Sequence, residues 1–308
     1  MKSFNILFKM QWDHYRKDIV TITYGWAITF ITLIVWLTFK QTDPGLFNYD
    51  PFVLASAIGV GTVRNCTHGV TRVLFNFKNQ GFMSRVYMTP VSKRNFIMSI
   101  ILFNTLVNFV ISVALFSFGM IYLDQRSILG NVNWPMFLLG YLMLVVTSLL
   151  ISFLIVEFVK SQDKASFWGN IFFYVCVWFL GLGVPYTELS QYEFFTYITY
   201  LFPQKYALNI MQSGWIGSTN FQIQEGANFG YSGHEFLPYL LGSLMIVILS
   251  CTLIFIYSKK YHSTKYTSSN NSTIQQSYER INQIKNARNI GELEGLMSSK
   301  SPPDEGGG

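Results

Sequence analysis

Long runs of apolar residues without a charged side chain constrain the fold of this chain more than any other feature. The first run covers residues 19–39. At 1.5 Å per residue, a helix of that length spans about 30 Å of hydrocarbon. Of all residues, 50% are hydrophobic and only 12% are charged, a composition that excludes an ordinary soluble domain. We therefore expect an all-α polytopic membrane protein.

Five more apolar segments predict a transmembrane domain of six helices within residues 19–258. The second run starts at Pro51, and the third to sixth runs cover residues 96–118, 136–156, 167–182 and 236–257. The second stays apolar only as far as Val63, and the fifth is short for a full crossing. Residues 259–308 are rich in Ser, Asn and Gln, which predicts a cytoplasmic and largely disordered tail.

Residues 1–18 are predicted to form an amphipathic helix at the membrane surface. The apolar side carries Phe4, Leu7, Phe8, Trp12 and Tyr15, and the polar side carries Lys2, Lys9, Asp13, Arg16 and Lys17. A basic face of this kind suits anionic lipid headgroups. The alternative is a soluble amphipathic helix that packs on a partner.

The distribution of Lys and Arg predicts the orientation of the chain. Basic residues recur near the N-terminus, in segment 78–94, and after the fourth and sixth runs, whereas the outer loops hold only Lys40, Arg126 and Lys205. Cytoplasmic segments carry the excess of Lys and Arg, so both termini are expected in the cytoplasm. The net charge of +6 is spread over these segments, which argues against a nucleic-acid partner.

The basic segment 78–94 separates the second run from the third. Gly81 begins and Thr89-Pro90 ends a predicted helix of about two turns along the membrane surface. Its apolar positions are Phe82, Met83, Val86 and Tyr87, with Arg85 between them. The alternative is an ordinary basic loop that only sets the topology.

Ionisable residues interrupt the second run at Arg64, His68 and Arg72. They are four residues apart and share one helix face. Such a face is costly in a membrane and normally points into a bundle or a watery cavity. Two interpretations are open: the face lines a substrate entrance in the inner leaflet, or the helix leaves the membrane near residue 70 and its basic end reaches lipid phosphates.

The third run contains a smaller polar stripe of Asn104, Asn108 and Ser112. Polar side chains in membrane helices often hydrogen-bond a neighbouring helix, and they can also contribute to a substrate path. The candidate path residues are Arg64, His68, Asn104 and Asn108.

Residues 186–217, after the fifth run, contain two aromatic and apolar clusters separated by Pro203. Neither cluster is long enough to cross a bilayer. Two short re-entrant helices in the outer leaflet account for both facts, because such backbone is tolerated where protein buries it. Pro185, Pro203 and Tyr206 mark this region. A plain amphipathic outer loop is the alternative.

The chain carries no catalytic, cofactor-binding or metal-binding pattern. It lacks a Gly-x-x-x-x-Gly-Lys-Ser/Thr phosphate loop, a nucleophile with a base, and His or Cys at metal-ligand spacing. Cys66, Cys176 and Cys251 lie in apolar runs, which favours free thiols. We expect that the chain is not an enzyme and that energy for work against a gradient comes from elsewhere.

Three stretches together resemble the ABC-2 type permeases, the membrane subunits of ABC exporters, over roughly residues 1–258. They are Gly81 with Arg85, Thr89-Pro90-Val91 and Lys93-Arg94; Phe167-Trp168-Gly169-Asn170 with Gly183-Val184-Pro185; and Phe202-Pro203-Gln204-Lys205-Tyr206. The chain departs from the family pattern in three places: no acid precedes Gly81, Phe202 replaces the usual Asn, and Gln212 stands near a common Arg.

The resemblance implies an N-terminal elbow helix, a cytoplasmic coupling helix in segment 78–94 and extracellular re-entrant helices after the fifth span. It implies a separate cytoplasmic ATPase subunit that binds ATP and magnesium, and a second copy of this permease or a related one. The implied ATPase contacts are Met83, Arg85, Val86 and Tyr87. The implied location is the bacterial plasma membrane, where membrane lipid surrounds the chain.

Two cargo classes are open for such a permease. Abundant Phe and Tyr favour an amphipathic or hydrophobic cargo such as a peptide, an antibiotic or a lipid. Arg64 and His68, where they face a cavity, favour an anionic lipid-linked polysaccharide or teichoic acid precursor. An ion-coupled secondary transporter or channel would place acidic residues within spans, whereas Glu157 lies at the end of the fourth run and no acid lies inside the runs. A structural or regulatory membrane subunit is a further alternative.

Overall fold

The computed structural model describes residues 2–40, 50–79, 93–184, 186–189, 192–224, 227–231 and 233–269. The described chain is mostly helical. It divides into two compact units, Met1–Leu253 and Ile254–Gly308. In the second unit, the described residues 254–269 form the last part of helix α14 (Leu237–Ser269).

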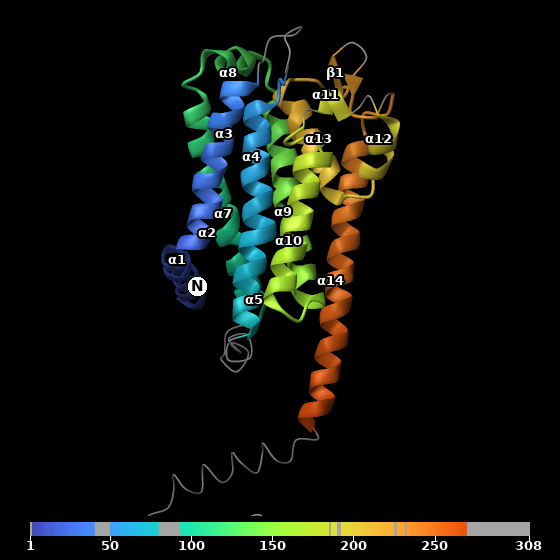
Figure 1. The fold of residues 1–308 in the computed structure, drawn as a ribbon. Coiled ribbons are helices and arrows are strands. Elements are labelled where there is room, and N and C mark those ends of the chain that lie inside the picture. The colour runs from blue at the N-terminus through green and yellow to red at the C-terminus, as the bar shows by residue number, and fades with distance from the viewer. Residues whose placement is uncertain are drawn as a thin grey trace, which may run out of the picture. The chain divides into compact units, whose positions relative to one another are not determined.

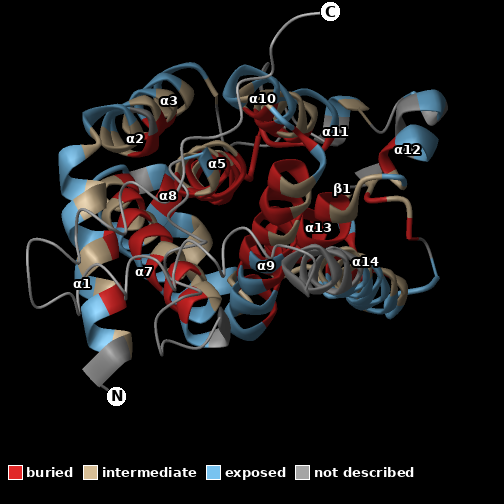
Figure 2. Ribbon diagram, turned by 90° about the horizontal axis from the view of Figure 1, so that it is seen from below, coloured by how far each residue is buried: buried red, intermediate tan, exposed pale blue. Residues whose placement is uncertain are grey.

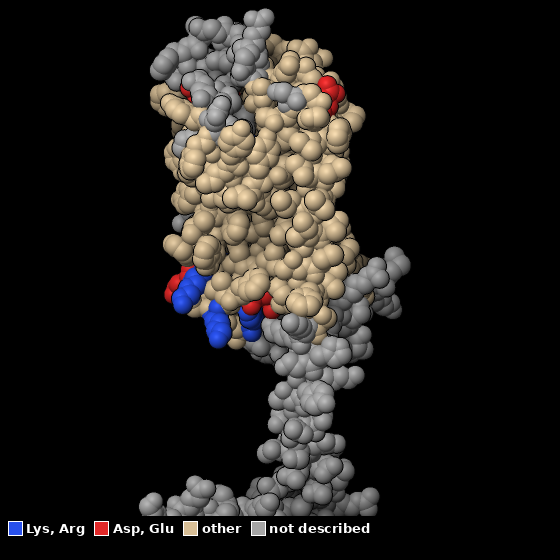
Figure 3. All heavy atoms as spheres, turned by 90° about the vertical axis from the view of Figure 1, so that its right-hand side faces the viewer, with Lys and Arg blue, Asp and Glu red and all other residues tan. Residues whose placement is uncertain are grey.

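Four helical segments in the described chain are long and apolar enough to cross a membrane. They are α2–η1–α3 (Ile19–Ile22, Thr23–Ala27, Ile28–Phe39), most of α7 (Lys93–Gly119), α9 (Trp134–Phe158) and the Leu237–Ser258 part of α14. On the face in Figure 3, charged side chains of described residues gather at the two ends, and a wide band without them lies between. The chain is thus a multi-pass membrane protein.

The second and fifth predicted runs are also helical. The second continues through α4 (Val53–Arg64), η2 (Asn65–Val70) and α5 (Thr71–Asn79), and the fifth is α10 (Gln162–Phe179). Both contain charged and strongly polar side chains, so neither reaches the apolar character of the four candidate spans. The count of six spans therefore stays a prediction.

Helix α4 forms the centre of the first unit. Every residue from Val53 to Val63 is buried, and α4 packs against α3, α7, α9 and α10. Figure 1 shows α3 and α9 beside it, and Figure 2 shows buried positions on α5, α7, α9 and α13. A helix that is enclosed on all sides needs no polar face, which explains its continuous apolar sequence.

Helix α13 (Pro203–Trp215) lies against α9 with very close backbone contact. A Cβ atom on Gly140 would come within 2.3 Å of the Met211 backbone nitrogen, and one on Gly214 within 2.4 Å of the Phe137 nitrogen. Small residues permit this approach between helices in a membrane protein. Pro203 occupies the first turn of α13, where its missing N–H costs no hydrogen bond.

The amphipathic N-terminal segment forms helix α1 (Lys2–Lys17), which packs on α7. The rings of Phe8, Trp12 and Tyr15 surround Phe103 of α7 with centroid distances of 5.3, 6.4 and 5.8 Å. The Trp26 indole N–H also donates to the Tyr15 hydroxyl at 2.9 Å. The aromatic side of α1 is therefore used in packing on the helical bundle.

Short elements connect the long helices at the end of the first unit that lies opposite α1 and α5 (Figure 1). They are α8 (Leu123–Ile128), η3 (Leu129–Asn131), α11 (Tyr186–Leu189), α12 (Glu193–Thr199) and the antiparallel strands β1 (Gln222–Gln224) and β2 (Ala227–Asn228). The Lys40 ammonium contacts the buried Asp50 carboxylate at 2.6 Å. The same ammonium donates to the Gly183 carbonyl at 3.0 Å, so one side chain joins three segments.

Candidate functional site

A cavity of about 370 Å³ lies beside η2 and contains the ionisable face predicted from the second run. Arg64, His68 and Arg72 all line it. Across from them, α10 contributes a polar row of four residues, and Val20 of α2 completes the lining. The α10 row is Gln162, Ser166, Asn170 and Tyr174, with Asp163 beside it. The volume of the cavity falls in the range of small-molecule sites.

Arg64 is held in position by an aromatic ring. Its guanidinium carbon lies 4.9 Å from the centroid of Phe173 on α10. Stacking of a guanidinium on an aromatic face leaves its N–H groups directed outward in the ring plane. Arg64 is thus half-buried and preorganised at the wall of the cavity.

Arg72 has a different partner, at the junction between α1 and α2. Its Nη2 atom lies 3.9 Å from Asp18 Oδ1. The Asp18 carboxylate also caps α2: Oδ1 accepts from the Thr21 backbone N–H at 3.2 Å, and Oδ2 from the Thr21 hydroxyl at 2.8 Å. Asp18 therefore connects the first helix of the chain to the basic cavity.

The donors at this cavity outnumber the acids. Two guanidinium groups face it, with an imidazole between them, and amide and hydroxyl groups of Gln162, Asn170 and Ser166 lie on the opposite wall. Asp163 lines the cavity as well, and Asp18 borders Arg72. Forked guanidinium groups bind phosphate and carboxylate in bidentate fashion. The arrangement is suited to binding an anionic group.

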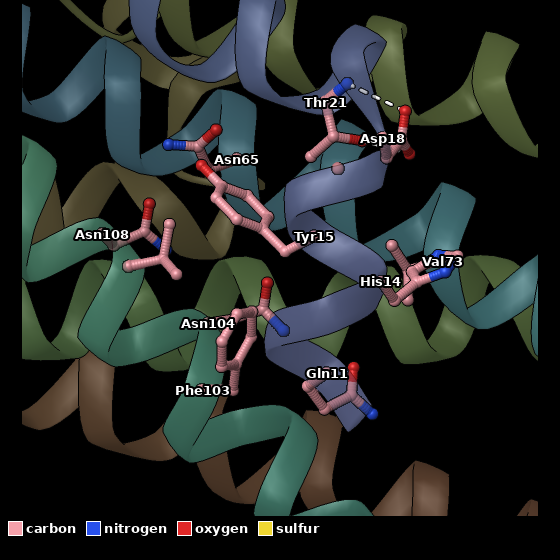
Figure 4. Close-up of a pocket in the computed structure, with 12 residues that line it drawn as sticks. Gln11, His14, Tyr15, Asp18, Thr21, Asn65, Val73, Phe103, Asn104 and Asn108 are labelled. Carbon is pink, nitrogen blue, oxygen red and sulfur yellow. Dashed lines mark hydrogen bonds between the residues drawn. The ribbon is translucent and has the colours of Figure 1, made fainter. Parts of the chain in front are cut away.

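Asn104 and Asn108 line a different cavity. This second space, of about 20 Å³, lies between α1, α2, η2, α5 and α7 (Figure 4). The Asn104 amide donates to the Ile100 carbonyl at 2.8 Å, and the Asn108 amide to the Cys66 sulfur at 3.1 Å. The structure thus separates these two residues from Arg64 and His68.

The second cavity is small and mainly apolar, with several polar side chains at its wall. Figure 4 shows Tyr15 of α1 directed toward Asn65 of η2. Within the described part of the chain, Gln11 Nε2, Asn65 Nδ2 and Asn108 Oδ1 are buried without a hydrogen-bond partner. A space of this size suits one water molecule.

The predicted ATPase contacts Met83, Arg85, Val86 and Tyr87 lie outside the described residues, as does Pro185. The helix that leads to the contact segment is anchored, however. The Lys78 ammonium at the end of α5 donates to the Val156 and Val159 carbonyls at 2.5 and 3.3 Å. These carbonyls belong to the C-terminal end of α9, where a cation is electrostatically favoured.

The predicted re-entrant region contains a buried lysine that sequence reasoning had counted as an outer-loop charge. Lys205 is 0% exposed, and its ammonium donates to the Thr199 hydroxyl at 2.7 Å. It also lies 3.8 Å from the Tyr200 ring centroid and 5.9 Å from that of Tyr231. Tyr206, which is 2% exposed, donates its hydroxyl hydrogen to the Tyr200 carbonyl at 2.7 Å.

The stability of the protein should depend on the protonation of Lys205, which lies outside the candidate membrane spans. Burial lowers the pKa of this ammonium from 10.5 to about 7. Between those pH values the unfolded chain holds a proton that the folded chain lacks, so stability should increase as the pH rises. Below pH 7 both states are protonated, and the cost of burial is fully present.

We expect the thermal unfolding midpoint of the wild type to rise between pH 7 and pH 9, and Lys205→Met to flatten that rise. The measurement is unfolding in detergent, followed by tryptophan fluorescence at each pH. Lys9→Met, at an exposed position of α1, should keep the wild-type dependence. Equal slopes for wild type and Lys205→Met would contradict the assignment.

Sequence reasoning missed the polar row on α10, although a signal was present. Gln162, Ser166, Asn170 and Tyr174 are four residues apart, the same spacing that singled out the basic face of the second run. Phe167-Trp168-Gly169-Asn170 was noted only as a motif. Gly169 allows α10 to pack closely on η2, since a Cβ at this position would meet the Thr67 carbonyl of η2 at 3.0 Å.

Comparison with protein-family models gives one match: the model described as ABC-2 type transporter matches residues 3–215. This range includes α1, the second run with its basic face, α10 and all of α13. Comparisons with curated proteins and with solved structures found no match.

Proposed function

We propose that this chain, which belongs to the ABC-2 type transporter family and is an ABC transporter permease subunit, exports an amphipathic or hydrophobic cargo across the bacterial plasma membrane. An anionic lipid-linked precursor is the alternative cargo. Permeases of this family work with an ATPase subunit. That subunit binds ATP and magnesium in this proposal, and the present chain performs no hydrolysis.

The basic cavity is the observation that carries the proposal. Arg64, His68 and Arg72 of the second predicted span line it together with polar side chains of the fifth. Its rim includes Val20 and Tyr174, which are both exposed apolar or aromatic side chains. A polar cavity with an apolar rim allows a molecule with a polar head to enter sideways from a lipid leaflet.

A second copy of the permease is proposed to close this path. Helices α2, α3 and α10 lie on the same side of the first unit, with α5 between them (Figure 2). These helices carry exposed apolar side chains, among them Ile31 and Val35 of α3 and Phe167 and Trp178 of α10. Six helices enclose little space by themselves, and a symmetric dimer brings two such faces together.

The contacts of α1 and α5 support a mechanical link to the ATPase. Aromatic packing attaches α1 to Phe103 of α7, and Lys78 attaches the end of α5 to α9. Segment 80–92 joins α5 to α7 in the chain. A push on this segment and on an elbow helix α1 would therefore shift whole helices, in the manner of rigid-body shear. Both termini are placed in the cytoplasm in this proposal.

The test is co-expression with the ATPase encoded beside this chain, followed by pull-down and ATP hydrolysis in lipid nanodiscs. We expect stable co-purification of the ATPase with the wild type. Replacing Arg85 and Tyr87 by Ala together should abolish cargo-stimulated hydrolysis, because these side chains are proposed to touch the ATPase.

Arg126 and Tyr122 provide the matched control, since they are the same residue types at exposed positions in α8 and directly before it. Their double Ala variant should retain coupled hydrolysis. Failure of any ATPase to associate would reject the export proposal and make ion-coupled transport the leading hypothesis. Full coupling in the Arg85/Tyr87 variant would reject the contact assignment alone.

A further inference from the structure

The basic cavity has one polar end and one aromatic end. Gln162 and Asp163 begin α10 and are exposed, whereas Tyr174 lies three turns further along the same helix. The distance along the helix between these ends is about 18 Å at 1.5 Å per residue. Arg64 stacks on Phe173 near the aromatic end. A ligand with a polar part beside the basic residues and an apolar part beside Tyr174 would match this lining.

The guanidinium groups select the chemistry of the polar part. Arg64 is preorganised on Phe173, and Arg72 and His68 follow on the same face. Two forked cations on one wall, with amide and hydroxyl donors on the other, match the several oxygens of a phosphate group. A single carboxylate has two oxygens and would use fewer of these donors.

Asp18 is a built-in competitor for this anionic group. Its carboxylate lies 3.9 Å from Arg72 Nη2 and also makes the cap interactions with Thr21. Asp18 directly follows α1, whose last residue is Lys17. An incoming anion that takes Arg72 therefore removes an interaction that restrains the junction of α1 and α2.

We propose that the cavity binds the phosphate group of a lipid-linked cargo and that Asp18 occupies Arg72 until this phosphate displaces it, an inference that rests on the proposed function with its alternative, anionic lipid-linked cargo. The lipid chain lies past the exposed Tyr174. Displacement of Asp18 reports the loaded cavity to α1, which is the helix proposed to meet the ATPase.

The test uses the purified permease alone, in nanodiscs of phosphatidylcholine, so that it does not depend on any ATPase. The probes for titration calorimetry are dioctanoyl phosphatidic acid, dioctanoylglycerol, which has the same chains without phosphate, and inorganic phosphate. We expect phosphatidic acid to bind at least tenfold more tightly than either of the other two, because only it supplies both parts of the ligand.

Four variants locate the site. Arg64→Gln and Arg72→Gln should each weaken phosphatidic acid binding about tenfold, as expected for loss of a charge-assisted contact. Asp18→Asn keeps the cap on α2, because Asn is a good N-cap residue, and removes the competing charge; it should tighten binding several-fold. Arg126→Gln, at an exposed position of α8, should bind like the wild type. Thermal unfolding verifies that each variant is folded.

Each contrary result removes a defined part of the inference. Equal binding of dioctanoylglycerol would show that the phosphate is not recognised, and equal binding of inorganic phosphate would show that the lipid is not. Unchanged affinity in folded Arg64→Gln and Arg72→Gln would return both arginines to nonspecific contact with lipid headgroups. Unchanged affinity in Asp18→Asn would reject the competitor role. Failed binding together with successful ATPase co-purification would reject this inference and leave the transport proposal standing.

Discussion

Replacing Gly140 by Ala should strongly destabilise this protein, although it adds only one methyl group. The added Cβ would lie 2.3 Å from the Met211 backbone nitrogen and 2.7 Å from its Cα. Backbone atoms of a packed helix cannot rotate away as a side chain can, so α13 must move from α9. Overpacking of this kind costs about 1–3 kcal/mol, and a displaced interface between two buried helices is expected at the upper end.

The effect should extend beyond the contact itself. The Gln212 amide of α13 donates to the Ser56 hydroxyl at 3.1 Å and to the Gly181 carbonyl at 2.8 Å. A shift of α13 therefore disturbs the central helix α4 and the turn after α10. We expect transport activity to fall together with stability.

The measurement is the temperature at which heating removes half of the monodisperse peak in size-exclusion chromatography, which is called the thermal midpoint below. Gly130→Ala is the matched control, because a Cβ at Gly130 meets nothing within 4 Å. The control should melt like the wild type. Equal midpoints for Gly140→Ala and Gly130→Ala would show that the close packing of α9 and α13 is not required.

Replacing Asp50 by Ala is expected to have an effect of similar or larger size. Asp50 is 1% exposed and holds the Lys40 ammonium at 2.6 Å, and it also accepts the Phe52 backbone N–H at 2.9 Å. Removing one partner of a buried ion pair leaves an uncompensated charge, which typically costs about 3–5 kcal/mol. The hydrogen bond from the Lys40 ammonium to the Gly183 carbonyl would be weakened at the same time.

Two further variants distinguish the causes of that loss. Asp50→Asn keeps an acceptor for the Phe52 N–H and should cost less than Asp50→Ala. The double variant Lys40→Met with Asp50→Leu removes both charges and should recover much of the stability, since a buried pair can be replaced by apolar side chains. The measurement is again the thermal midpoint. A double variant no more stable than Asp50→Ala would mean that the charge left on Lys40 is not the source of the cost.

The arginine face of the second run illustrates how far sequence periodicity reaches. The spacing of Arg64, His68 and Arg72 predicted that they share one side of a helix, and they do line one cavity. The sequence left two destinations open for that side, because periodicity is a local property. Only the position of α10 shows what faces the basic groups: a row of amides and hydroxyls, Phe173 under Arg64, and an exposed aromatic rim.

The polar residues of the third run show the limit of the same reasoning. Asn104 and Asn108 were grouped with Arg64 and His68 because all four are polar side chains in apolar runs. The structure places the asparagines at a separate small cavity against α1. Lys205 was likewise counted among exposed loop charges, although tyrosine rings and the Thr199 hydroxyl surround its ammonium. Composition cannot reveal such long-range neighbours.

By itself, the sequence determined that this is a helical membrane protein with an amphipathic first helix, and its ordered motifs pointed to the permease family that the family model also matches. These properties follow from hydropathy and period along the chain, which act locally. The tertiary structure alone decided which polar side chains meet, that Asp18 reaches Arg72, and that two glycines bring α13 onto α9. Those outcomes depend on helices that are far apart in sequence and are brought together only by packing.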